Sequence, residues 1–267
     1  AKSNDLGVFS NLDYVTNDWS FLFGIRFDYR KINAESNSFK NDFNALSSSL
    51  GFSKIFNDHK LKFSYSSAFR TPHISELLSD GVHHATKRYE VGDPNLIEEK
   101  GNQLDLTYEW SDEHLGLIVN PFVNSIDDFI ILSPQDSTIN NNPLYVYEQL
   151  DNVKLKGIEI NIHYHPHFLH KLHIEERISI MQGKSSEDQY LPLMPANTFQ
   201  TSIKYYFLSN NMFNCREVSL NHTYNSSQKK VANNESPTDA YSLINASLLF
   251  GSKSNKINLS VGVRNLL

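Results

Sequence analysis

The sequence predicts an all-β protein: an antiparallel, up-and-down transmembrane β-barrel, of which the 267 residues form a partial barrel with about twelve strands. Three observations predict this fold. Apolar and polar side chains alternate over many segments, several segments reach about ten residues, and the connections between them alternate between short and long.

Residues 19–30 show the alternation most clearly. Trp19, Phe21, Phe23 and the following odd-numbered positions are aromatic or aliphatic, whereas most even-numbered positions are polar or small. Successive strand residues point to opposite faces, so this segment has one apolar and one polar side. The same pattern, less regular in four cases, predicts strands in order at residues 6–14, 19–30, 46–52, 61–70, 103–110, 115–123, 157–164, 172–180, 199–207, 217–224, 242–250 and 257–264. No segment has the period of an amphipathic helix.

Alternation alone would also suit a soluble β-sandwich, in which the apolar rows form the core. Strands of about ten residues are longer than usual for soluble sheets and suit a tilted membrane span. Aromatic residues gather near the ends of the apolar rows, as in interfacial girdles, and the polar rows contain Lys, Arg, Asp and Glu, which suit a wet lumen.

The connections favour the barrel over the sandwich. The short ones are predicted at residues 16–18, 57–59, 111–114, 166–171, 208–214 and 251–255; the long ones are predicted at residues 31–40, 71–100, 133–142, 183–196 and 226–239. Successive turns of an antiparallel meander lie at opposite ends, so one end should have short turns and the other long loops. Outer-membrane barrels have short periplasmic turns and long extracellular loops.

Composition excludes several other classes. No apolar run approaches the length of a membrane-spanning helix, and a net charge of −6 gives no reason to expect nucleic acid. The single cysteine, Cys215, rules out an intrachain disulfide, and we expect an inert thiol. Phosphate-binding loops, nucleophile elbows and zinc-protease motifs are missing from the sequence, so we do not expect an enzyme.

Four stretches carry a more specific signal. They read FRTPHISEL at 69–77, GDPNL at 92–96 followed by Glu99, YEQLDNVKLKGIEI at 147–160, and VGVRNLL at 261–267. Together they resemble the TonB-dependent receptor family of Gram-negative outer membranes. The motif residues are Phe69, Arg70, Pro72, Glu76, Leu77, Gly92, Pro94, Leu96 and Glu99. Pro72 suits a strand end and Pro94 a turn, so the simpler interpretation of these residues is architectural.

The resemblance implies a barrel of roughly 22 strands with a plug domain. We therefore expect residues 1–267 to be part of such a barrel, with the plug and the last strands absent. It also implies uptake of a scarce nutrient, a metal ion or metal chelate, with zinc favoured and an iron–siderophore as another candidate. The expected partners are outer-membrane lipid, lipopolysaccharide and, through the plug, the TonB complex. The alternatives are a passive porin-like barrel and a soluble β-rich module that binds glycans.

Two groups of histidines are candidate metal ligands. The stretch GVHHATKRYEVGDPNL at 81–96 resembles a histidine-bearing segment of receptors associated with zinc import, which suggests His83, His84, Glu90 and Asp93 as ligands of a metal ion at the outer mouth. The alternative is a solvated polar loop. The second group, HYHPHFLHKLH at 163–173, places His163, His165 and His173 on the lumen side, where we expect ordinary turn and lumen residues.

Glu176 and His222 interrupt otherwise apolar rows. A charged group on the lipid side is unfavourable, so we expect either a position near an interface or a bulge that shifts the register. Gly157 and Gly262 leave room on the inward row for something that approaches closely.

Overall fold

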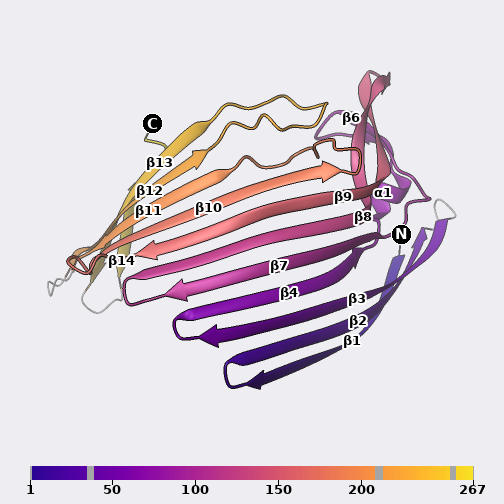
Figure 1. The fold of residues 1–267 in the computed structure, drawn as a ribbon. Helices are drawn as coiled ribbons and strands as arrows, with labels where there is room; N and C mark the ends of the chain where they lie inside the picture. Colours follow the sequence, from indigo (N-terminus) through magenta and orange to yellow (C-terminus); the bar gives the residue numbers. More distant parts are fainter. Residues whose placement is uncertain (1, 35–38, 208–212, 253–256, 267) are drawn as a thin grey trace.

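Twelve strands follow one another across a single curved sheet in the computed structural model, each hydrogen-bonded to its neighbours in the sequence (Figure 1). The structure describes residues 2–34, 39–207, 213–252 and 257–266. The strands are β1 (Lys2–Thr16), β2 (Trp19–Ala34), β3 (Phe39–Phe56), β4 (His59–Arg70), β7 (Glu99–Ser111), β8 (Leu115–Ile139), β9 (Asn142–Tyr164), β10 (Leu172–Ser185), β11 (Thr198–Tyr206), β12 (Phe213–Asn225), β13 (Tyr241–Ser252) and β14 (Asn258–Val263). Each of the twelve predicted segments falls on one of them, and all pairs along this path are antiparallel, which confirms the predicted fold class.

The strand register places apolar and polar side chains on opposite faces of this sheet, which we call the wall. Phe21 lies opposite Phe52, Phe52 opposite Phe63, and Phe63 opposite Leu106, so one apolar row crosses four strands. Its members are not sealed in a core: Phe21 is 44% and Phe52 39% exposed. The apolar face is thus not covered by other described parts of the chain, as the barrel prediction requires.

The short connections confirm the prediction wherever the structure describes them. Asn17 and Asn57 have positive φ angles of 45° and 52°, a conformation that asparagine tolerates in tight turns. Together with the turns at 112–114 and 165–171 they lie at one end of the wall, which we call the short-turn end (Figure 1). Much of the predicted connections 208–214 and 251–255 lies outside the described residues.

Two predicted long loops are wrong. Residues 133–142 are not a loop, because β8 and β9 pair with each other until the two-residue turn at Asn140 and Asn141. Most of the 31–40 connection is likewise strand, since β2 reaches Ala34 and β3 begins at Phe39. Both extensions are rich in polar residues, so the alternation that marks a strand is weak there. The remaining long connections, 71–98, 186–197 and 226–240, lie at this second end, the long-loop end.

The longest connection contains three short elements that the sequence did not reveal. They are α1 (Ile74–Leu78), β5 (Asp80–His83) and β6 (Arg88–Val91). β5 and β6 form a small antiparallel hairpin, and β6 also pairs with the extension of β9 in parallel. In Figure 1 these elements lie against the wall at the long-loop end.

The apolar core of the described residues lies here rather than in the wall. Leu77 and Leu96 from the connection pack with Ile32, Phe43 and Ile130 from β2, β3 and β8. None of these five side chains is more than 7% exposed. No helix in the part of the chain that the structure describes is long and apolar enough to span a membrane.

Glu176 stays in its apolar row. It lies opposite Ile162 of β9 and Thr201 of β11 in an unbroken register, so the expected bulge is wrong at this position. Thr201 Oγ1 donates to Glu176 Oε2 at 2.5 Å, and His222 on the next strand lies opposite Thr201 and contacts Ser242. Cys215 lies beside a register shift between Cys215 and Glu217.

Atoms of the same chain fill the space beside Gly157. A Cβ atom there would come within 2.8 Å of the Phe122 ring and 2.6 Å of the Ile180 carbonyl oxygen. The close approach that the sequence suggested at Gly157 is made by a neighbouring strand.

Candidate functional site

The connection 71–98 is fastened to the wall by an ion network at the end of β4. The Arg70 guanidinium donates two hydrogen bonds to the Glu99 carboxylate, at 2.6 and 2.7 Å, and a further pair to Glu76, at 2.9 and 3.0 Å. Glu99 Oε1 also accepts the backbone N–H of Ile130 at 2.8 Å. Two carboxylates and one guanidinium thus join β4, α1, β7 and β8.

The other motif residues tighten the same joint. Gly92 lies against the backbone of α1, where a Cβ atom would come within 2.7 Å of the Glu76 carbonyl oxygen and the Leu78 nitrogen. The Gly92 N–H donates to the Ser79 carbonyl, and the Asp93 N–H to that of Glu76. Pro72, Leu77 and Leu96 are fully buried, Pro94 lies in a turn, and Phe69 lies opposite Lys100 at the end of β4.

The four residues suggested as metal ligands at the outer mouth each have different contact partners. His83 contacts Thr86, and the exposed His84 lies in the turn between β5 and β6. Glu90 is buried and accepts from Arg88 at 2.7 Å and from Tyr147 at 3.3 Å, whereas Asp93 accepts from Asn95. Within the described ranges, no three of these four form a group able to hold one ion. Their role as ligands stays a prediction.

The face of the wall opposite the apolar rows is lined by charged and small polar side chains. Ion pairs cross or follow its strands, among them Asp5–Arg30 at 2.5 Å and Lys60–Glu109 at 3.3 Å. Serine is frequent between them, for example at Ser49 and Ser66, which face each other across β3 and β4. Such a surface is compatible with water and with the passage of a polar solute.

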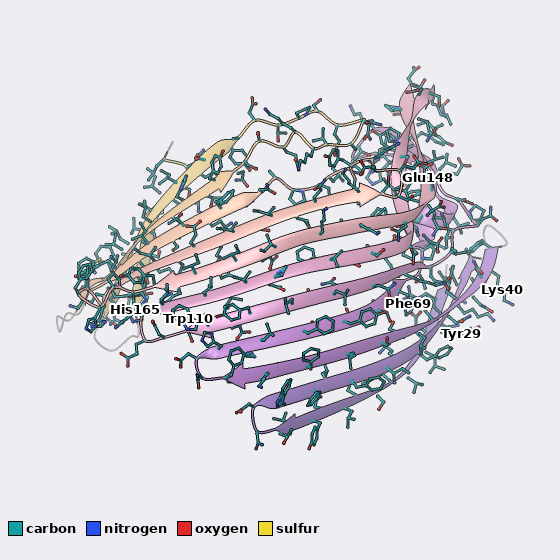
Figure 2. All side chains as sticks on the ribbon, viewed as in Figure 1. Tyr29, Lys40, Phe69, Trp110, Glu148 and His165 are labelled. Atoms are coloured by element: carbon teal, nitrogen blue, oxygen red, sulfur yellow. The ribbon has the colours of Figure 1, made fainter. Side chains whose placement is uncertain are left out.

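Six histidines gather at the short-turn end, and sequence reasoning grouped only five of them. His114 lies in the turn before β8, whereas His163, His165, His167, His170 and His173 span the connection from β9 to β10. β8 pairs with β9, and the His165 N–H donates to the His114 carbonyl at 2.9 Å, which brings His114 into the cluster. The signal that could have found it is a histidine in the neighbouring short turn of a predicted meander. Figure 2 shows His165 and Trp110 at this end, away from Phe69 and Lys40.

Two groups outside the spanning segments have shifted pKa values. The backbone N–H groups of His114 and Leu115 donate to Asp112 and lower the pKa of its carboxyl. At the long-loop end, the hydrogen bond from Tyr89 to Asp80 raises the pKa of the Tyr89 hydroxyl. These hydrogen bonds hold the turn before β8 and the hairpin of β5 and β6.

A two-sided antiparallel wall with one apolar face, one charged face and unequal ends is the architecture of a transmembrane β-barrel protein. More particularly, the chain belongs to the TonB-dependent receptor family, because a family model described as "TonB dependent receptor-like, beta-barrel" matches residues 1–266. A comparison with curated protein sequences found no match.

Solved structures of similar fold agree with this assignment. The copper transporter OprC superposes with a TM-score of 0.83 at 16% identity, covering 99% of this chain and 42% of its own. The FrpB iron transporter from Neisseria meningitidis superposes with a TM-score of 0.75 at 15% identity. The match covers 99% of this chain and 41% of FrpB. A mutant of the ferric enterobactin receptor PfeA from Pseudomonas aeruginosa superposes with a TM-score of 0.74 at 18% identity. The match covers 99% of this chain and 39% of PfeA. This chain therefore spans about two fifths of the length of each.

Proposed function

We propose that this chain forms part of the barrel wall of an outer-membrane receptor that imports a metal ion or metal chelate with energy from the TonB complex. The observation that carries this proposal is the family match over residues 1–266 on a wall with an apolar outside and a charged inside. The outward rows would contact lipid and the long-loop end lipopolysaccharide, on the cell surface of a Gram-negative bacterium. The short-turn end would face the periplasm.

The similar structures support a metal cargo in general terms. Their names refer to copper, iron and ferric enterobactin, and those names carry no support for the zinc that the sequence favoured. In this proposal the chain is a transporter rather than an enzyme and holds no cofactor of its own. His83, His84, Glu90 and Asp93 remain the proposed capture residues at the outer mouth.

Uptake by cells that depend on this gene tests the proposal. A deletion strain complemented with the complete gene product would be supplied, separately, with a labelled ferric siderophore, Cu²⁺ and Zn²⁺ at limiting concentration. We expect complementation to restore uptake of at least one cargo, and an inactive TonB to abolish it. Uptake that persists without TonB would indicate a passive porin-like barrel instead.

The capture residues are tested in the same cells. If His83 and His84 hold the cargo metal, the variants His83→Ala and His84→Ala raise the cargo concentration needed for half-maximal uptake. Unchanged uptake in both would remove them as ligands but leave the transport proposal intact.

A further inference from the structure

Strand register brings the six short-turn histidines to one place. β9 lies between β8 and β10: His163 pairs with Gly116 of β8 on one side and with Glu175 of β10 on the other. The antiparallel register continues past the last paired residues, so His165 lies between His114 and His173. The positions of His163, His165 and His173 thus follow from adjacent strand ends, and the turns beside them carry His114, His167 and His170.

The imidazoles form two groups of three. His114, His167 and His170 form the outer group on the turns, and their ring centroids lie 4.8–5.3 Å apart. His163, His165 and His173 form the inner group on the strand ends, with centroids 5.3–5.7 Å apart. His114 Nδ1 and His165 Nε2 join the two groups at 3.2 Å.

The spacing suits metal coordination. In each group, one ring nitrogen from every histidine lies within 4.8 Å of the other two. Three nitrogens at about 2.0–2.1 Å from a tetrahedral ion are roughly 3.3 Å apart, so small side-chain rotations would close either group around one ion. These are the only two such groups that the described part of the chain contains.

Hydrogen bonding leaves ligand atoms available. His165 Nδ1 is buried and has no hydrogen-bond partner among the described residues. A buried polar atom without a partner is unfavourable, and a metal ion would remove that cost.

From this geometry we propose that the short-turn end carries a paired transition-metal site, with one ion held by His114, His167 and His170 and a second by His163, His165 and His173. All-imidazole donor sets suit divalent zinc, copper and nickel, and do not suit the harder calcium and magnesium ions. In each group three histidines leave a fourth position for water or an exchangeable ligand. The site lies at the opposite end from the capture residues and does not depend on the proposed transport.

Metal binding to the purified complete gene product, in detergent and stripped with a chelator, tests the site. The probes are Zn²⁺ for stoichiometry and Co²⁺ for the visible absorption that reports nitrogen coordination, with Ca²⁺ as the hard-ion comparison. We expect the variant with His114, His167 and His170 changed to Ala to lose one bound Zn²⁺, and the variant with His163, His165 and His173 changed to Ala to lose another.

The control is His222→Ala, which removes a histidine of β12 that belongs to neither group and should leave both ions bound. His167→Ala with His170→Ala gives a second test of the outer group, because both side chains are exposed and their loss should not prevent folding. Heat-dependent migration on gels establishes that each variant is folded.

Unchanged Zn²⁺ stoichiometry and affinity in a variant that lacks all six histidines would overturn the site. A loss confined to one triple variant would overturn the assignment of the other group. Equal displacement of Zn²⁺ by Ca²⁺ would overturn the imidazole ligands.

Discussion

The two ends of the wall are built by opposite means. At the long-loop end, Leu77 and Leu96 fill an apolar cluster, and the Arg70 guanidinium donates hydrogen bonds to both the Glu76 and the Glu99 carboxylate. At the short-turn end the turns are tight, Phe168 is 86% exposed, and six imidazoles stand beside one another. One end is stabilised by burial and charge pairing, whereas the other presents donor atoms.

This difference separates structural from chemical roles. Motif residues such as Arg70 and Gly92 hold the connection 71–98 against the wall. His114, which belongs to no motif, lies where an ion could bind. Substitutions should therefore reduce stability at the long-loop end and metal binding at the short-turn end.

Loss of the Arg70 side chain should have the largest effect on stability. Arg70→Ala leaves Glu99, whose side chain is 9% exposed, without its cation. Removing one partner of a buried ion pair costs about 3–5 kcal/mol, and the lower value applies here because the Arg70 side chain is 44% exposed. The free energy of unfolding of the complete gene product in detergent, followed by tryptophan fluorescence in urea, measures it.

Two comparisons isolate the cause. Arg26→Ala removes a similar pair with Asp28 on an open face, where solvent screens the charges, and should cost much less than Arg70→Ala. Arg70→Met with Glu99→Gln removes both charges and keeps an oxygen for the Ile130 N–H, so it should recover much of the loss. An Arg70→Ala effect no larger than that of Arg26→Ala would contradict the network's role.

A methyl group at Gly92 should have the next largest effect. Gly92→Ala places Cβ within 2.7 Å of backbone atoms of α1, which cannot move away as a flexible side chain can. Overpacking of this kind costs about 1–3 kcal/mol. Gly81→Ala is the matched control, because a Cβ atom at Gly81 meets nothing within 4 Å. Equal unfolding free energies for the two variants would show that the contact between Gly92 and α1 adjusts to the added methyl group at little cost.

The sequence was sufficient for the wall and insufficient for its ends. Alternation located all twelve strands because a wall with one apolar and one polar face forces a period of two. Alternation failed at residues 133–142, because polar residues continue both strands of the paired β8–β9 extension there. It also missed α1, whose five residues are too few to show a helical period.

The histidine cluster illustrates a different limit. His163 to His173 were visible as a run, but His114 is 51 residues away from His165 and joins it only through the β8–β9 register. A one-residue error in register would place these side chains on the opposite face. Predicted strand boundaries are uncertain by about two residues or more, so the grouping could be obtained only from the structure.

Asp112 should have the smallest effect, and one that depends on pH. Its carboxylate accepts the N–H groups of His114 and Leu115, both at 2.7 Å, and so fixes the turn that carries His114. Because these bonds lower the pKa of Asp112 in the folded protein, their contribution is complete above the ordinary carboxyl pKa and is lost as pH falls through the folded value. Asp112→Ala should therefore lower the unfolding temperature at pH 7 and make progressively less difference below about pH 4.

Asp112→Ala should also weaken Zn²⁺ binding by the outer group while the inner group, which has no residue on this turn, keeps its ion. Asp112→Asn retains an acceptor oxygen and should fall between wild type and Asp112→Ala at pH 7. An Asp112→Ala deficit that is the same at pH 7 and pH 3 would mean that the charge of this carboxylate does not hold the turn.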